Sequence, residues 1–162
     1  MSQQLEDIEA IKRLKYRYCR CIDTANIKEL AELFTEDASV RYVGGSYLFE
    51  AQGRDKIIEA IGYAFHAEAI AFHHVNHPEI DIVSPTEATG VWYLKDWFLD
   101  LRNKIITDGT SFYKDRYVKR DGKWLIQYAS YERVYEIVTP FEQAPNITAH
   151  YLAKHGKKLP PA

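Results

Sequence analysis

Apolar residues recur at steps of three and four along the first part of the chain, and this spacing is typical of amphipathic helices. The pattern predicts a first helix over residues 5–25. Asn26 comes next, and Glu29 follows three positions later, which is the capping-box pattern of a helix start. We therefore expect a second helix over residues 27–35, and the two should form a helical hairpin.

Alternation with a period of two begins after this hairpin and predicts strands. Residues 39–43 are strand-like, Gly44 and Gly45 interrupt them, and residues 47–51 should pair back as a second short strand. A third helix is expected after Gly53. Its apolar stripe consists of Ile57, Ile58, Ile61, Ala64 and Phe65.

Long alternating stretches separated by short turns make up the rest of the chain. They predict strands over residues 70–83, 88–101, 105–118 and 123–138. Asp121-Gly122, in the last turn, is a strong hairpin signal. Helices followed by a meander predict the α+β class, with three N-terminal helices packed on one face of a curved antiparallel sheet. We expect one domain over residues 1–138 and a C-terminal tail over residues 139–162, with a short helix around residues 147–154.

Charge is balanced along the chain, with 21 Lys and Arg against 23 Asp and Glu. Because no basic stripe is available to neutralise phosphates, we expect no nucleic-acid partner. Cys19 and Cys21 are two positions apart on a predicted helix, which points them to different sides and argues against a disulfide or a structural zinc site. The sequence shows no signal peptide and no membrane-spanning run, so we expect a cytoplasmic protein without a membrane partner.

The aromatic content is high, with twelve Tyr, seven Phe and three Trp. These side chains suit either a large aromatic core or a pocket for a flat, mostly apolar ligand. Composition alone does not separate the two interpretations. The polar residues that interrupt apolar stretches are more informative about a pocket.

Three of the six histidines, His73, His74 and His77, lie within five positions where a strand is predicted. Histidine titrates near neutral pH, so a histidine on a pocket wall is a natural general acid and base. Strict alternation would place His74, and not His73, on the side of the following isoleucines. Pro78 favours a bulge, which would reverse this parity. The pattern therefore leaves both histidines open as the base.

Asp96 is a carboxylate on an otherwise apolar strand face. Burying it without a partner would be costly, so either a His or Arg side chain meets it or that face is wet. Alternation places it on one face with Gly90, Trp92, Leu94 and Phe98.

Arg133 lies near the end of the last predicted strand. It could hold a ligand carboxylate or pair with Glu132 or Glu136 on its own strand. Asp115, between two basic residues, is expected to be a surface charge.

Tyr18 and Asp23 lie near the end of the first predicted helix. An acidic side chain at a helix C-terminus opposes the helix dipole, so Asp23 either faces solvent or serves a purpose there. Positions five apart are separated by about 140° around an ideal helix. Tyr18 and Asp23 therefore converge only if the helix end is distorted or a pocket wraps around it.

Several motifs together resemble a known family. They are the stretch from Ile11 to Asp23, Leu33-Phe34-Thr35-Glu36-Asp37-Ala38, His73-His74 with Pro78-Glu79-Ile80, Ala88 to Asp96, and Tyr113-Lys114-Asp115-Arg116-Tyr117 before Asp121-Gly122-Lys123-Trp124. Over residues 5–136 the chain resembles the SnoaL-like branch of the nuclear transport factor 2-like (NTF2-like) superfamily. It is most similar to the bile acid 7α-dehydratases and more loosely similar to scytalone dehydratase and hexachlorocyclohexane dehydrochlorinase.

The resemblance implies a cone of curved sheet, closed by three helices around a deep pocket, without metal or organic cofactor. It implies Tyr18, Asp23, His73 and Asp96 as catalytic residues, and the motif spacing favours His73 over His74. Val75-Asn76-His77 stands where relatives often carry a Gly-His pair, so the pocket wall beside His73 could differ. Residues expected to bind the substrate are Arg133, His74, Trp92, Phe98 and Phe112.

The reaction that this resemblance implies is dehydration, that is, cofactor-free elimination of water from a hydroxy-carbonyl, polycyclic, steroid-like substrate. Neutral His73, oriented by Asp23 or Asp96, would remove a proton while Tyr18 donates a hydrogen bond to the carbonyl. An isomerase or a polyketide-cyclase-type enzyme would use the same pocket without expelling water. A non-catalytic ligand-binding or structural subunit is the alternative outside enzymes. The resemblance further implies a homotrimer, with a dimer next.

Overall fold

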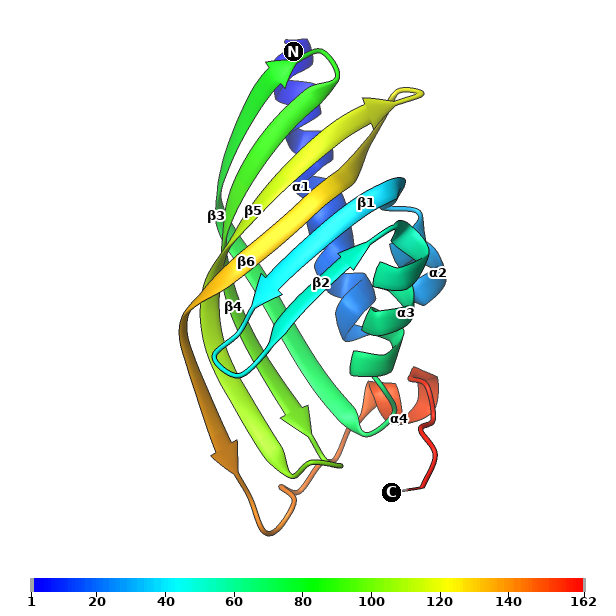
Figure 1. Cartoon of the computed structure of the whole chain (residues 1–162), viewed down its shortest axis with the longest axis vertical. Helices are drawn as coiled ribbons and strands as arrows, with labels where there is room; N and C mark the ends of the chain where they lie inside the picture. The colour runs from blue at the N-terminus through cyan, green and yellow to red at the C-terminus, as the bar shows by residue number, and fades with distance from the viewer. Residues whose placement is uncertain (1, 162) are drawn as a thin grey trace.

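The computed structural model of the protein describes residues 2–161, and its main feature is a curved six-stranded sheet with helices on the concave side (Figure 1). The helices are α1 Gln3–Asp23, α2 Ile27–Ala31, α3 Arg54–Ala64 and α4 Tyr151–His155. The strands are β1 Phe34–Val43, β2 Leu48–Gln52, β3 Ala69–Ser84, β4 Glu87–Asp100, β5 Ile105–Arg120 and β6 Lys123–Pro140. The predicted α+β class, with three N-terminal helices on a curved sheet, is confirmed.

The strands follow the order β2-β1-β6-β5-β4-β3, and the sheet is not closed. Consecutive strands from β3 to β6 pair antiparallel, as the hairpin signals predicted. One pair differs from the expected antiparallel sheet, because β1 runs parallel to β6. This pairing places the N-terminal part of the chain beside the last strand and brings β1, β2 and α3 over one half of the concave face.

The second helix starts where the capping pattern predicted but ends early. The Asn26 side chain accepts a hydrogen bond from the backbone N–H of Glu29 and donates one to its carboxylate. The helix ends at Ala31 and not at residue 35, because the carbonyl of Leu33 accepts a hydrogen bond from the backbone N–H of Ile126 on β6. Pairing with the sheet therefore overrides the helical pattern.

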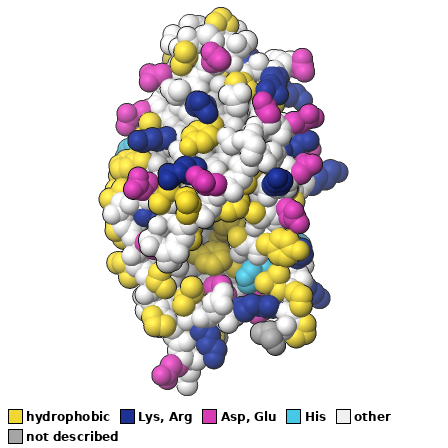
Figure 2. Space-filling model, viewed as in Figure 1, with side chains coloured by type: hydrophobic (Ala, Val, Ile, Leu, Met, Phe, Trp, Pro, Cys, Tyr) yellow, Lys and Arg dark blue, Asp and Glu magenta, His cyan; other side chains and the backbone are white. Residues whose placement is uncertain are grey.

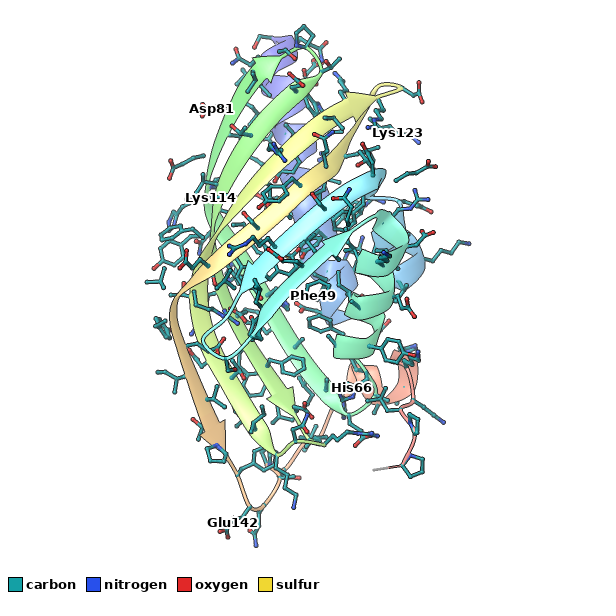
Figure 3. The ribbon with its side chains drawn as sticks, in the orientation of Figure 1. Phe49, His66, Asp81, Lys114, Lys123 and Glu142 are labelled. Atoms are coloured by element: carbon teal, nitrogen blue, oxygen red, sulfur yellow. The ribbon has the colours of Figure 1, made fainter. Side chains whose placement is uncertain are left out.

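Helix α1 covers one end of the concave face and supplies much of the core. Ile11, Leu14, Tyr18, Cys21 and Ile22 are buried on its inner side, as the period predicted, whereas Leu5 is exposed. Against them lie large buried side chains of the sheet, among them Trp92, Tyr113 and Tyr117. Asp81 and Lys114 point away from the helices on the convex side (Figure 3).

An ion pair lies inside this core, and it corrects the expectation for Asp115. Lys15 of α1 donates a hydrogen bond to the Asp115 carboxylate at 2.7 Å, and both side chains are fully buried. The hydroxyl of Tyr117 donates to the same oxygen, and Trp92 donates to that hydroxyl. Asp115 is therefore a buried partner of a helix lysine and not a surface charge, because strand alternation turns it inward beneath α1.

The C-terminal tail packs on its own chain, at the end of α3 and the start of β3. The backbone N–H of Ala67 donates to the carbonyl of Lys157, and the His150 ring bonds the carbonyl of Ala69, each at 2.9 Å. His66, labelled in Figure 3, lies at this junction. Within residues 2–161, none of the helices is both long enough and apolar enough for a membrane crossing.

Candidate active site

A cavity of about 390 Å³ opens between the sheet, the end of α1 and α3. Figure 2 shows the face on which the molecule is hollowed, with hydrophobic side chains at the bottom of the hollow and a histidine at its edge. Its wall is mainly aromatic and aliphatic, with few ionisable groups. The lining residues are Tyr18, Ile22, Tyr42, Tyr47, Phe49, Ala60, Ile61, Ala64, Phe65, His73, Asp96, Phe98, Thr107, Tyr113, Tyr131 and Arg133.

His73 and Asp23 form a hydrogen-bonded dyad at the edge of this cavity. The Nδ1 atom of His73 lies 2.6 Å from one Asp23 oxygen, and the backbone N–H of His73 donates to the other oxygen at 2.9 Å. With the carboxylate holding the proton on Nδ1, the Nε2 atom has a free lone pair and can act as a base. Asp23 is the last residue of α1, and it lies behind His73 and not in the cavity wall itself.

A bulge in β3 decides which histidine faces inward. His77 has a positive φ of 47°, and the pairing with β4 gains one extra residue on β3 between Asn76 and Glu79. His73 and Ile80 are therefore both turned to the concave side, although they are an odd number of positions apart. The bulge that Pro78 suggested is present, and the structure places His73 in the cavity wall.

Arg133 joins two carboxylates on the opposite wall. Its guanidinium makes a two-pronged contact with Asp96, one arm of it at 2.8 Å, and its Nε donates to Glu136 at 3.0 Å. All three side chains are less than a tenth exposed. Burial works against the charge of Arg133, but the hydrogen bonds and the negative charge of Asp96 outweigh it and raise its pKa. Asp96 therefore meets an arginine on its apolar strand face.

Two local features of the sheet allow this contact. An extra residue in β6, Val134, shifts the pairing with β5, so that Arg133 and Glu136 face the same side despite their odd spacing. Gly109 of β5 lies between Asp96 and Glu136 in the register. A methyl group on Gly109 would come within 2.7 Å of a guanidinium nitrogen, so Arg133 can cross β5 only because a glycine stands there.

Tyrosines form the inner part of the cavity, and sequence reasoning identified only one of them. The hydroxyls of Tyr18 and Tyr42 are 2.8 Å apart, and those of Tyr47 and Tyr131 are 2.6 Å apart. The rings of Tyr42 and Tyr131 stack at 4.6 Å between centroids. In each pair one hydroxyl donates to the other, so one proton per pair is left for a ligand.

Burial raises the pKa of Tyr18 and Tyr42 well above the usual value. Both phenols therefore stay protonated at physiological pH and can act only as neutral hydrogen-bond donors or acceptors. Such donors suit the stabilisation of negative charge that develops on a substrate oxygen.

Of the predicted site residues, Tyr18, His73, Asp96, Phe98 and Arg133 line the cavity, and Asp23 lies directly behind His73. Tyr18 and Asp23 do not converge. Tyr18 lines the cavity directly, whereas Asp23 contacts it only through the His73 ring.

Three residues expected to bind the substrate lie elsewhere. His74 is exposed on the convex side, because its neighbour His73 takes the inward position. Trp92 is fully buried under α1, in edge contact with Tyr16, because the helix covers that end of the stripe. Phe112 is exposed on the convex face against Tyr93, because alternation turns its neighbour Tyr113 inward.

Some residues of the cavity wall were not predicted, although the alternation of the strands points to two of them. Tyr113 shares its strand face with Asp115 and Tyr117, and Tyr131 shares its face with Ala129, so alternation could have found both. Phe49, labelled in Figure 3, reaches the cavity from β2 beside α3, which only the parallel pairing of β1 brings there. The pairing of Arg133 with Glu136 is one of the alternatives that the sequence left open, whereas the hydrogen bond from the backbone N–H of Gly45 to Glu136 carries no sequence signal.

The assembled groups suit proton transfer inside an apolar cavity. They offer an oriented imidazole base, tyrosine donors and a charged wall, on three sides of one space. Within residues 2–161, no group of three or more His, Cys, Asp or Glu side chains comes together in a way that could hold a metal ion. Cys19 and Cys21 are both free and buried.

Comparison with known proteins gives a consistent result. The family model of the SnoaL-like domain matches residues 3–130. A candidate scytalone dehydratase from Novosphingobium aromaticivorans is 28% identical, with a TM-score of 0.71 over 88% of this chain and 97% of that chain. The hexachlorocyclohexane dehydrochlorinase LinA type 3 from Novosphingobium barchaimii is 17% identical, with a TM-score of 0.72 over 90% of this chain and 97% of that chain.

A third similar structure carries a different description. It is a candidate aromatic ring hydroxylase from Novosphingobium aromaticivorans, 18% identical, with a TM-score of 0.73 over 85% of this chain and 94% of that chain. At this level of identity the likeness concerns the fold alone, so the reaction has to be argued from the site.

Proposed function

The chain belongs to the SnoaL-like domain family of the NTF2-like superfamily, and from this premise we propose that it is a cofactor-independent dehydratase. The observation that carries the proposal is the His73–Asp23 dyad on the wall of an apolar cavity. Similarity to a candidate scytalone dehydratase supports an elimination reaction. The proposed substrate is a hydroxy-carbonyl compound with a flat, polycyclic, steroid-like body, since aromatic rings line most of the cavity.

In the proposed reaction, Nε2 of His73 removes a proton made acidic by a carbonyl group of the substrate. Asp23 orients the imidazole and stabilises the imidazolium that forms. A hydroxyl of the Tyr18–Tyr42 pair donates a hydrogen bond to the carbonyl oxygen as negative charge develops. The imidazolium then returns the proton to the departing hydroxyl, which leaves as water beside the wall formed by Asp96 and Arg133.

The test is an absorbance scan with a 7-hydroxy-4-en-3-one steroid, because elimination extends the conjugation and adds a band at longer wavelength. His73→Ala should lower the rate by about 10²–10⁴-fold, the usual contribution of a general base. His74→Ala is the matched control, since that neighbouring side chain lies on the convex side, and it should keep the activity. Equal activity in wild type and His73→Ala would refute the assignment of the base.

Product mass separates the competing reactions. An isomerase or a cyclase using the same dyad would give a product without loss of water. Saturable binding of the steroid with no chemical change in wild type would favour a non-catalytic ligand-binding subunit. The joint presence of the dyad, the tyrosine donors and the charged wall supports an enzyme, because a structural subunit would need none of them.

We also propose a homo-oligomer, with a trimer ahead of a dimer. The convex face carries exposed apolar side chains, including Tyr93, Phe112 and Ile137, in the positions that a subunit contact would cover. Light scattering coupled to size-exclusion chromatography measures the mass, and a monomer at micromolar concentration would refute the proposal.

A further inference from the structure

The arginine in the cavity wall lies between two acidic side chains. Arg133 directs Nη1 and Nη2 to Asp96 and Nε to Glu136, while Nη1 also lies 3.5 Å from the Ser111 hydroxyl. A free guanidinium recognises a carboxylate by a two-pronged contact, and here Asp96 already occupies that contact. A carboxylate on a ligand would therefore have to displace Asp96 from Arg133.

The charges around the cavity are not balanced. Among the residues that the structure describes, Arg133 is the one Lys or Arg side chain in the lining. Three carboxylates lie in or directly behind the cavity walls: Asp96 and Glu136 on the arginine side, and Asp23 behind His73 on the opposite side. Lys15 lies behind the rings of Tyr18 and Tyr113, but Asp115 already pairs with it. The surplus charge at the cavity walls is negative, and the burial of Arg133, Asp96 and Glu136 weakens its screening by solvent.

Glu136 is the side chain that produces the surplus on the arginine side. One of its oxygens accepts from Nε of Arg133, and the other accepts from the backbone N–H of Gly45 in the turn between β1 and β2. The Glu136 side chain is only 6% exposed. It is thus fixed from two sides and holds a second negative charge against an arginine that Asp96 alone would neutralise.

We propose that this arrangement makes the cavity selective for ligands that are uncharged where they enter it, and that Glu136 is the specificity-determining residue. The inference rests on the proposed function and narrows its substrate class. The part of the substrate inside the cavity is a neutral carbonyl or hydroxyl compound and not a free carboxylic acid. A thioester fits this class, since its acyl part is neutral and its charged part stays outside.

The experiment uses two probes that share a naphthalene body, 2-naphthol, which is uncharged near neutral pH, and 2-naphthoate, which is an anion. Isothermal titration calorimetry of the wild-type protein should show naphthol binding at least about tenfold more tightly, the effect of roughly one pKa unit of charge interaction. Glu136→Gln removes the surplus charge at nearly constant size and should reduce this preference at least about threefold, since the remaining wall is closer to neutral.

Two controls localise the effect. Glu132→Gln removes a charge from an exposed position of the same strand and should leave the preference unchanged. Ala60→Phe fills the cavity from α3 without touching the charged wall and should abolish naphthol binding. Circular dichroism checks the fold of each variant. The preference for naphthol over naphthoate is measured on the wild-type protein and does not depend on any variant folding.

Several results would overturn the proposal. These are equal or tighter binding of naphthoate to wild type, a preference that a folded Glu136→Gln leaves unchanged, naphthol binding that survives Ala60→Phe, and binding of neither probe. Failure of the dehydratase function is a separate result: naphthol preferred over naphthoate, with no water lost from the hydroxy-enone, would retain the selectivity and refute the reaction.

Discussion

Two buried ion pairs share the concave face of the sheet, and they differ in what covers them. Lys15 and Asp115 join α1 to β5, and aromatic rings enclose both charges completely. Arg133 and Asp96 join β6 to β4 across β5, and the cavity lies over them. Both pairs place an aspartate on an otherwise apolar strand face. Only the second leaves that aspartate within reach of a ligand.

The difference follows from where α1 ends. The helix covers the sheet at Trp92 and Asp115, and it stops at Asp23, so the next part of the sheet is left open. Burial raises the pKa of Asp115, although Lys15 and Tyr117 act in the other direction, and its second oxygen has no hydrogen-bond partner among residues 2–161. A polar group on an apolar strand face is therefore a poor marker of a functional site by itself. Whether a helix or a cavity lies over the group decides whether it can contact a ligand.

The largest expected effect on stability comes from the enclosed pair. Lys15→Met should lower the free energy of unfolding by about 3–5 kcal/mol, because it leaves the buried Asp115 charge without its cation, and only the Tyr117 hydroxyl still donates to it. Urea denaturation measures the loss. The double variant Lys15→Met with Asp115→Asn removes both charges and should recover most of it. A single variant within about 1 kcal/mol of wild type would show that water reaches this pair.

Breaking the second pair should cost less stability and more activity. Arg133→Met leaves Asp96 and Glu136 without their partner, but the cavity can admit water to both, so we expect a loss of about 1–3 kcal/mol. The rate of the proposed reaction should fall by at least about tenfold, since the charged wall loses its geometry. The same denaturation series compares the two pairs directly, and a larger loss for Arg133→Met than for Lys15→Met would reverse the assignment of which pair is structural.

Gly109→Ala sharpens the comparison without removing a charge. The added methyl group would meet the Arg133 guanidinium and the carbonyl of Tyr135, at 2.7 and 3.1 Å, so the guanidinium must shift into the cavity. We expect a stability loss of about 1 kcal/mol from overpacking, with a clear loss of activity. Gly122→Ala, in the exposed turn after β5, is the contrasting variant: it strains a backbone with a φ of 76° and should lower stability while preserving the rate. Full activity of Gly109→Ala would mean that the position of Arg133 is unimportant.

The sequence predicted the elements better than the site. Hydrophobic periods gave three N-terminal helices and four long strands because each period depends on local geometry alone. The faces of His73, Arg133 and Glu136 could not be read from alternation, since one extra residue at His77 and another at Val134 reverse the parity along β3 and β6. The pairing of Lys15 with Asp115 spans a hundred positions and needs the packed fold. For His73, the family motif gave the inward position that alternation left open.

The smallest effect on stability is expected at a third ion pair, which is exposed to solvent, unlike the two buried pairs. Glu29 accepts hydrogen bonds from Arg20 and Arg17 on the surface of α1, and these arginines lower its pKa to about 2. A carboxyl group with a lowered pKa stabilises the folded state above its ordinary pKa, and this contribution is lost as the pH falls from about 4.5 toward 2. At neutral pH, Glu29→Gln should therefore cost at most about 1 kcal/mol, as is usual for a surface pair.

The pH dependence separates this pair from the enclosed one. As the pH falls through that window, wild type and Glu29→Gln should converge in stability, because the wild-type carboxylate becomes protonated and loses its advantage. Salt should reduce the difference at neutral pH, since exposed charges are screened. The loss caused by Lys15→Met, in contrast, should hardly respond to salt, because no solvent separates Lys15 from Asp115. A Glu29→Gln difference that persists below about pH 2, where the folded-state carboxyl is protonated as well, would assign its effect to the side-chain hydrogen bond from Asn26 and not to the arginines.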